Sequence, residues 1–236
     1  MNSTNKNYGN RYGNVLTMIL VVVVVIILGI AGYFGYSIYK QGATNKAAEA
    51  ALTDFEQATK SVRKKVQDKE EEQLPEGETL VPDMSAYQNV TQQEQTEAPK
   101  KVMYEGYEVK GEISIPKTGC KYPVLAEVTK HSLEVAVAIL YGPGLNEPGN
   151  TVIVGHNYRN GLFFSNNSKL AKGDTIIIKS ATETVNYTIY NTYYTSPDDA
   201  SYMKRDVEEG VREISLSTCN NDSSQRLIIW AREQGK

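Results

Sequence analysis

The hydrophobic and polar positions divide the chain into three stretches. Residues 15–39 are predominantly apolar and contain no charged residue. Residues 40–104 are polar, first rich in Ala, Glu, Lys and Gln, and then in Gln, Glu, Thr and Pro. From residue 105 onward, short runs rich in Val, Ile and Tyr alternate with turn residues. This pattern predicts an apolar helix, a polar connection and a mainly β domain.

The apolar run at 15–39 is long enough to cross a bilayer, which takes about 20 residues in a helix. A cleaved signal peptide has a shorter apolar core of roughly 7–15 residues. We therefore expect an uncleaved transmembrane anchor, with a buried core helix as the alternative. Lys6 and Arg11 precede the run, and the first fourteen residues contain no acidic residue. This favours a cytoplasmic tail at 1–14, a single-pass protein of the cell membrane, and an extracellular C-terminal part.

The polar connection has two parts. Its first part predicts a helical stalk at 40–73, because apolar residues recur there at spacings of four and three. Those positions are Ala48, Leu52, Phe55, Thr59, Val62 and Val66. The stalk either self-associates weakly through this seam or stays a solvated single helix. The second part, 74–104, contains Pro75, Pro82 and Pro99 among polar residues and predicts a flexible linker.

The third stretch, 105–236, is expected to fold as the globular domain of the chain. Its strand-like runs are 112–115, 151–154, 175–179, 184–194, 213–218 and 226–231. Helical signals are few and short, at 132–140 and 198–204. So many short strands in a segment of this length predict a β-barrel or a β-sandwich.

Composition narrows the classes of function. The net charge is −3 and no large basic patch is present, which argues against nucleic acid as a partner. We expect no cofactor and no metal, because the chain has neither a Gly-rich phosphate loop nor a Cys-x-x-Cys pattern. A calcium site is the weaker alternative to a solvated acidic face. The residues that would form it are Glu147, Asp206, Glu208 and Glu209.

The chemistry points to a cysteine nucleophile. Cys219 stands where a strand-like run ends in "SLSTCNND", and a thiolate needs a base or a cationic partner. Of the two histidines, His156 ends the apolar strand "NTVIVGH", whereas His131 opens a short amphipathic helix. Arg226 follows Cys219 after the six residues "NNDSSQ" and is the expected oxyanion donor. Arg232 would lie on the same face, but roughly 20 Å further along the strand.

These segments resemble the sortase family. "SLSTC" followed by "RLIIWA" resembles its Thr-Leu-X-Thr-Cys signature and the arginine that opens the next strand. "GNTVIVGHNYRNGLFF" is similar to its histidine segment, and "GEISIPKTGCKYPVL" to its entry strands. The resemblance covers about 105–233, and Ser215 replaces the usual first Thr. It implies a mainly β fold, an eight-stranded barrel with short helices, here preceded by one transmembrane helix and a helical or disordered stalk.

The resemblance also implies an activity and a site. Cys219 matches the family's nucleophile, His156 its histidine and Arg226 its arginine, while Thr218 and Leu216 of the same motif are assigned to substrate binding. The implied reaction cleaves a Leu-Pro-X-Thr-Gly-like sorting signal between Thr and Gly through a thioacyl intermediate. The implied partners are surface proteins that carry this signal, and a peptidoglycan-precursor amine or pilin lysine that accepts them.

The spacing and order of these residues bear on the sortase class and on two rival functions. Sixty-three positions separate His156 from Cys219, which leaves little room for the helical insertion typical of class B. A class A, D or E-like sortase is therefore expected, and residues 190–210 are expected to set specificity. One rival is a cell-wall cysteine peptidase or amidase, although papain-like enzymes place the cysteine before the histidine. The other is a non-enzymatic anchored surface module with a Cys120–Cys219 disulfide.

Overall fold

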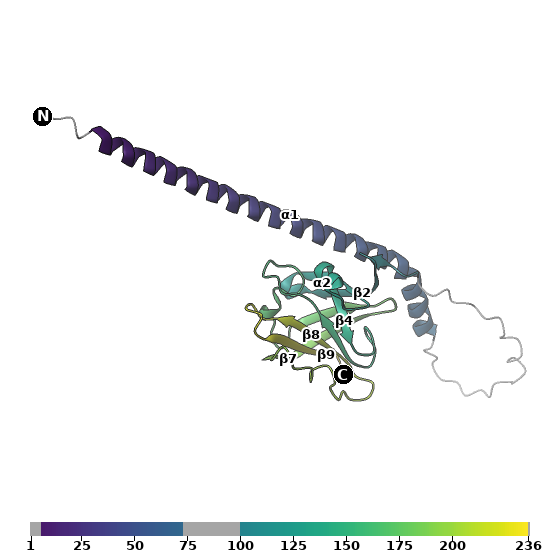
Figure 1. Ribbon diagram of the computed structural model, residues 1–236. Helices are drawn as coiled ribbons and strands as arrows, with labels where there is room; N and C mark the ends of the chain where they lie inside the picture. The colour runs from purple at the N-terminus through teal and green to yellow at the C-terminus, as the bar shows by residue number, and fades with distance from the viewer. Residues whose placement is uncertain (1–5, 73–99, 236) are drawn as a thin grey trace, which may run out of the picture. The chain divides into compact units, whose positions relative to one another are not determined.

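The structure is a computed structural model that describes residues 6–72 and 100–235. The chain forms two compact units, Met1–Asn45 and Lys46–Lys236. A single helix, α1 (Lys6–Glu72), contains both the expected anchor at 15–39 and most of the expected stalk at 40–73 (Figure 1). Residues 73–99, which include most of the expected linker, lie outside the described residues.

The first unit presents the apolar part of α1. One candidate membrane span is Tyr12–Val66. Its most apolar segment has a mean hydropathy of 3.2, and no part of that segment is buried inside the protein. The large apolar side chains from Val15 to Tyr39 are exposed along this stretch. This part of the helix is thus long and apolar enough to cross a membrane.

The second unit begins within α1, whose later turns pack against the β domain. Ala51 and Phe55 belong to one apolar cluster with Tyr104, Val109 and Leu125 of that domain. Phe55 is only 4% exposed. The recurring apolar positions of this segment therefore bury themselves in their own chain, which differs from both expected states of the stalk. An apolar stripe on a helix is stabilised by any apolar face that it can reach, and here the barrel supplies one.

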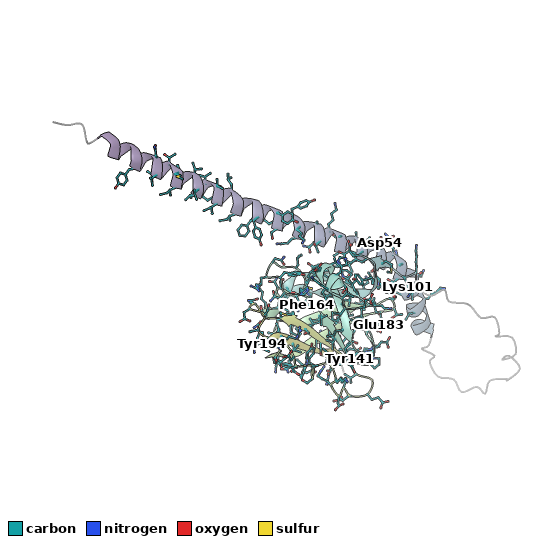
Figure 2. All side chains as sticks on the ribbon, viewed as in Figure 1. Asp54, Lys101, Tyr141, Phe164, Glu183 and Tyr194 are labelled. Carbon is teal, nitrogen blue, oxygen red and sulfur yellow. The ribbon has the colours of Figure 1, made fainter. Side chains whose placement is uncertain are left out.

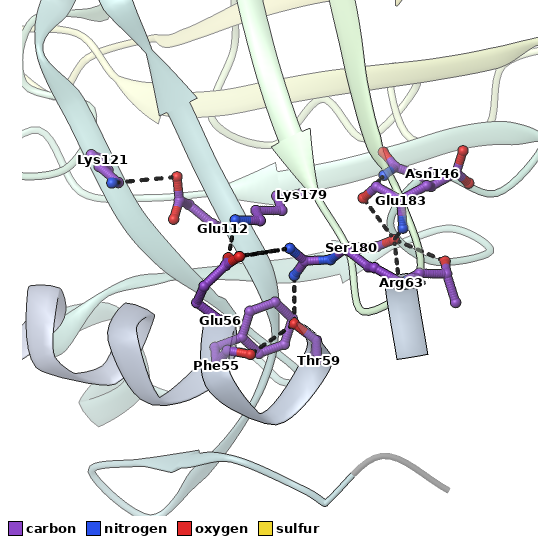
Figure 3. A network of polar contacts seen from close by, with 11 residues as sticks. Phe55, Glu56, Thr59, Arg63, Glu112, Lys121, Asn146, Lys179, Ser180 and Glu183 are labelled. Carbon is purple, nitrogen blue, oxygen red and sulfur yellow. Dashed lines mark hydrogen bonds and ion pairs between the residues drawn. The ribbon is translucent and has the colours of Figure 1, made fainter. Parts of the chain in front are cut away.

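A polar network borders this contact (Figure 3). Glu56 accepts hydrogen bonds from Arg63 Nη1, at 3.1 and 3.3 Å, and from Lys179 Nζ on the barrel. Arg63 Nη2 also donates to Thr59 Oγ1. The hydrogen bond from Lys179 is the largest of the effects that lower the pKa of Glu56. The network links one helical turn to a barrel strand and supports the apolar packing beside it.

The β domain is a closed barrel of eight strands. Its strands are β2 (Tyr107–Ile115), β3 (Cys120–Leu125), β4 (Val137–Tyr141), β5 (Gly149–Val154), β6 (Thr175–Lys179), β7 (Thr184–Thr195), β8 (Arg212–Cys219) and β9 (Arg226–Glu233). They are ordered β2-β3-β4-β5-β8-β9-β7-β6, and pairing between β2 and β6 closes the barrel. A two-residue strand, β1 (Met103–Tyr104), pairs with β2. The expected mainly β fold with an eight-stranded barrel is confirmed.

All six expected strand runs overlap observed strands, but two of the expected helices are corrected. Within 132–140, only α2 (Lys130–Val135) is helical, and the rest becomes β4. This segment pairs with β3 through Val137 and Ala138 and with β5 from Ala138 onward, which outweighs its local helical pattern. Residues 198–204 form turns instead of a helix. The remaining short helices are η2 (Pro116–Thr118) and η3 (Asn167–Lys169).

The neighbouring strands β5 and β8 are well packed in the core of the barrel. Phe164, labelled in Figure 2, is fully buried, whereas Tyr194 at the barrel surface is half exposed. Six consecutive residues of β8 are buried, so this strand is covered on both faces. Its neighbour β5 is buried in the same way over its last five residues. Side chains at the ends of β5 and β8 are therefore held by well-packed backbone.

Candidate active site

Cys219 and Arg226 occupy the two ends of one hairpin. Cys219 is the last residue of β8, Arg226 is the first of β9, and the antiparallel register sets them directly opposite each other. The connecting turn is closed by Asn220, whose backbone N–H donates to the carbonyl of Gln225 at 2.9 Å. The hairpin that the six-residue spacing predicted is thus observed, and it brings the thiol and the guanidinium to one end of the barrel.

His156 reaches the same end from β5. β5 runs parallel to β8, and the last pair of their ladder is Val154 opposite Ser217, two residues before His156 and Cys219 along the chain. Gly155 lies between the end of β5 and His156 along the chain. A Cβ at this position would lie 2.7 Å from Val137 Cγ1 and 2.9 Å from Phe164 Cδ2. Glycine is needed here because the backbone that delivers His156 passes directly over packed side chains.

Asn157 joins the two strand ends and was not expected from the sequence. Its Nδ2 donates to the carbonyl oxygen of Cys219 at 3.0 Å and to Asn221 Oδ1 at 3.1 Å. Its own Oδ1 accepts from the backbone N–H of Arg159 at 3.1 Å. Asn157 therefore fixes the segment after His156 to the residue that carries the thiol. An asparagine beside a histidine gives no sequence signal for such a long-range bond.

His156 sits in a partly apolar environment. Its ring centroid lies 4.9 Å from that of Tyr158, at an interplanar angle of 35°. Burial lowers the pKa of His156, and the nearby negative charge of Glu134 on α2 opposes that effect in part. The neutral imidazole is thus favoured, and its protonated form is a stronger acid than a free imidazolium. Both properties suit a group that exchanges a proton during the reaction.

Arg226 is oriented by the loop between β7 and β8. Its Nε donates to the carbonyl oxygen of Pro197 at 3.1 Å. Its two terminal nitrogens form no hydrogen bond within residues 6–72 and 100–235. They remain available as a planar pair of donors at the hairpin end. A backbone carbonyl or a developing oxyanion is the kind of acceptor that such a pair serves.

The two other motif residues lie beneath the surface. Thr218 is 3% exposed, and its Oγ1 has no hydrogen-bond partner within the described chain. Leu216 is 1% exposed and belongs to the barrel core. Leu216 therefore packs in the core below the strand end, and Thr218 keeps a buried hydroxyl without a partner among the described residues.

Both cysteines are free in the structure, so the Cys120–Cys219 bridge is not formed. Cys120 is buried, and burial raises the pKa of its thiol to about 12. Cys219 is partly exposed. Among the described residues, no group of three or more His, Cys, Asp or Glu side chains is arranged to hold a metal ion.

A buried ionic cluster fixes the β7–β8 loop. Glu213, only 2% exposed, accepts hydrogen bonds from Arg205 Nη2, from Arg232 Nε at 2.8 Å and from Tyr190 OH at 2.8 Å. Arg205 belongs to the loop, and its guanidinium carbon lies 4.1 Å from the ring centroid of Trp230. The loop that supplies Pro197 to Arg226 is thus anchored to β8 and β9. Sequence reasoning had treated Arg232 only as a distant strand residue.

The Sortase domain family model matches residues 113–234 of this chain, more than half of its length. The chain belongs to the sortase family. The match includes the ends of β5, β8 and β9 that carry His156, Cys219 and Arg226. The family expected from the sequence motifs is therefore confirmed, and sortases are transpeptidases as a class.

Individual relatives agree with this assignment. A sortase A of Bacillus anthracis is 30% identical over 125 residues, which is 52% of this chain. The match spans 58% of that relative, so the chain covers less than two thirds of its length. Sortase C1 of Streptococcus suis has 25% identity and a TM-score of 0.50 over 55% of this chain and 75% of its own. A Clostridium perfringens sortase D5 transpeptidase, 21% identical, shares the fold with a TM-score of 0.55 over 80% and 99%.

Proposed function

We propose that this sortase is a membrane-anchored cysteine transpeptidase that cleaves a Leu-Pro-X-Thr-Gly-like sorting signal between Thr and Gly. The observation that carries the proposal is the register of the strand ends. Cys219 lies directly opposite Arg226 in the β8–β9 ladder, and the β5–β8 ladder ends two residues before His156, whose neighbour Asn157 donates to the carbonyl of Cys219 at 3.0 Å. A nucleophile, a proton carrier and an oxyanion donor thus converge on one end of a rigid barrel.

In the first half of the reaction, the Cys219 thiolate attacks the threonine carbonyl carbon. The C–S bond forms, and the terminal nitrogens of Arg226 stabilise the charge on the carbonyl oxygen. The C–N bond to glycine then breaks, and the His156 imidazolium gives its proton to the leaving amine. Because burial lowers the pKa of His156, this proton is released readily. The product is a threonyl thioester on Cys219.

In the second half, an amine attacks the thioester carbon. A new C–N bond forms, the C–S bond breaks and the thiolate of Cys219 is restored. The neutral imidazole of His156 takes the proton from the attacking amine, so the pair returns to its starting state. The amine comes from a cell-wall precursor or a pilin lysine, and the transferred chains are surface proteins that carry the sorting signal.

The remaining features support a surface location. The apolar stretch of α1 would hold the enzyme in the cell membrane through residues 15–39, with the N-terminus in the cytoplasm and the barrel outside. The short interval between His156 and Cys219 favours a class A, D or E-like enzyme. Arg205, which holds the β7–β8 loop through its ion pair with Glu213, lies in the stretch 190–210, where substrate specificity is expected.

The test uses the full-length protein in detergent, a panel of Leu-Pro-X-Thr-Gly peptides and an added amine, with products followed by mass spectrometry. Cys219→Ala should abolish both the thioacyl enzyme and the transfer product. His156→Ala should reduce both by about 10²–10⁴-fold, whereas the matched control His131→Ala should change little. A loss below tenfold at His156 would remove it from the mechanism. Hydrolysis without any transfer to the amine would favour a peptidase instead.

A further inference from the structure

A pocket of about 330 Å³ adjoins the catalytic end of the barrel and has no part in the reaction described so far. Its lining includes Arg159, Lys169, Ser165 and Asn221. Asn221 also accepts the hydrogen bond from Asn157 Nδ2, the same group that donates to the carbonyl of Cys219. One side chain thus connects the wall of the pocket to the residue that carries the thiol.

The charge of the pocket is positive and uncompensated. Arg159 and Lys169 both line it, and no aspartate or glutamate does. Neither cation forms an ion pair within the described residues. Other cations of the barrel do form such pairs: Lys117, Lys121, Lys179, Arg205, Arg212 and Arg232. Two unpaired cations on one concave surface create a positive potential that favours an anionic group.

The loop that presents Arg159 is held in a fixed conformation. Arg159 has a φ of 58°, an unfavourable left-handed value for a residue other than glycine. The bond from its N–H to Asn157 Oδ1 supports this conformation. Ser165 Oγ accepts from the N–H of Tyr158 at 3.1 Å and donates to the carbonyl of Leu162 at 2.6 Å. Such preorganisation lowers the conformational entropy that the loop itself must lose when a group binds.

The position of the pocket suits the acceptor that enters in the second half of the proposed reaction. The incoming amine must occupy the place that the glycine amine has left, because His156 exchanges a proton with both. The rest of the acceptor then extends on the His156 side, over the segment 157–169 that follows it. This segment forms most of the pocket lining. We propose that the pocket binds a carboxylate of the acceptor, so that the preferred acceptor is an amine with a carboxylate nearby. This inference rests on the proposed transpeptidation.

The test compares acceptors that differ only in this charge. The full-length protein in detergent is first acylated with a sorting-signal peptide. Transfer is then measured to glycine, β-alanine, 4-aminobutanoate and 6-aminohexanoate, and to the primary amide of each. At low salt, at least one acid should exceed its amide by about tenfold or more in kcat/KM for the acceptor, as expected for charge-assisted hydrogen bonds. The spread of lengths allows for the distance between thioester and pocket.

Each variant is judged by the ratio of kcat/KM for an acid to kcat/KM for its amide. A general loss of activity lowers both values and leaves this ratio unchanged. Arg159→Gln and Lys169→Gln should each bring this ratio close to one, and Arg159→Lys should keep part of it. Lys172→Gln, an exposed lysine outside the pocket, is the control and should keep the full ratio. Equal use of acids and amides by an enzyme that forms the thioester would overturn this inference alone. Failure to form any thioester would overturn the proposed function together with it.

Discussion

Arg226 and Arg232 lie on the same strand but have different partners. Arg226 faces Cys219 across the β8–β9 ladder and donates through Nε to the carbonyl of Pro197 at 3.1 Å. Arg232 faces Glu213 in the same ladder and donates to its Oε1 at 2.8 Å. One arginine therefore lies opposite the proposed nucleophile, and the other neutralises a buried carboxylate.

The first prediction separates these two roles. Arg226→Ala should lower kcat/KM on one sorting-signal peptide by about 10²–10³-fold, the scale of losing one oxyanion donor. Arg226→Lys should restore only part of it, because a lysine lacks the planar fork of two donors. Arg232→Ala should leave kcat/KM nearly intact and lower the melting temperature instead. If Arg232→Ala were the inactive enzyme and Arg226→Ala the active one, the assignment of Arg226 would be wrong.

The second prediction concerns pH. Because burial lowers the pKa of His156, its imidazole should titrate below the ordinary value of about 6.5. Glu134→Gln should lower this pKa further, since the carboxylate of Glu134 favours the imidazolium. The shift should be small, because Glu134 is exposed and its charge is screened by solvent. NMR titration of the imidazole signals in His131→Ala protein, which leaves His156 as the only histidine, measures it directly.

The same depressed pKa makes stability depend on pH. Just below pH 6.5 the unfolded chain binds a proton at this position more readily than the folded chain. The free energy of unfolding should therefore fall as the pH drops through this window, and His156→Gln should flatten that part of the curve. Urea unfolding between pH 7.5 and 5 tests this. An unchanged slope in His156→Gln would show that His156 titrates alike in both states.

The third prediction concerns the buried carboxylate of Glu213. Burial opposes its ionisation, but hydrogen bonds from Tyr190 and Arg232 and the charge of Arg205 outweigh this and lower its pKa. Glu213→Gln should destabilise the protein by roughly 3 kcal/mol, the lower end for breaking a buried ion pair, because Arg232 is partly exposed.

The loop should respond together with the stability. The single tryptophan of the chain, Trp230, lies under the Arg205 guanidinium. Its emission should therefore change when Glu213→Gln releases the loop. Glu209→Gln, an exposed carboxylate in the same loop, is the matched control. Unfolding experiments monitored by Trp230 fluorescence measure both effects, and a Glu213→Gln protein as stable as the wild type would contradict the cluster's role.

The fourth prediction tests the contact between α1 and the barrel. Phe55→Ala removes the largest side chain of the helix at this contact, and a buried Phe contributes about 1.5–3 kcal/mol. Since 1 kcal/mol shifts the melting temperature of a domain of this size by about 2–4 °C, the loss should be several degrees. Gln57→Ala, exposed on the same helix, should have no such effect. Calorimetry decides between them.

The same contact bears on the domain boundary. A fragment that begins at residue 105 was expected from the sequence to fold alone, and this remains a prediction. Without α1 it would expose Val109 and Leu125, which α1 covers. A fragment that begins at Lys46 should therefore melt at a higher temperature than one that begins at residue 105. Equal melting temperatures would mean that the helix adds no stability to the barrel.

The sequence was most informative where local rules and global fold agree. The run 213–218, its short turn and the run 226–231 predict a hairpin, and its register alone brings Cys219 to Arg226. The apolar strand that precedes His156 is equally clear, because a short continuous apolar run is bounded by Gly149 and Gly155. The long apolar run at 15–39 needs only length and composition to be recognised.

Other elements depend on partners that a single sequence does not show. β3 contains Lys121 and Pro123, which weaken its strand pattern, and β4 continues directly from the helical signal of α2. The apolar seam of α1 predicts burial but not the surface that provides it. Asn157 and Glu213 act through bonds to residues far along the chain, and no local pattern indicates such bonds.

The parallel pairing of β5 with β8 also bears on when the proposed catalytic pair forms during folding. His156 and Cys219 are far apart in sequence, and this ladder aligns the two strands that lead to them. Non-local strand pairs form late in folding, since closing a long loop costs entropy before the contacts form. A nascent or damaged chain thus carries an ordinary thiol without its imidazole partner. In the proposed mechanism, completion of the barrel is therefore the step that creates the reactive pair.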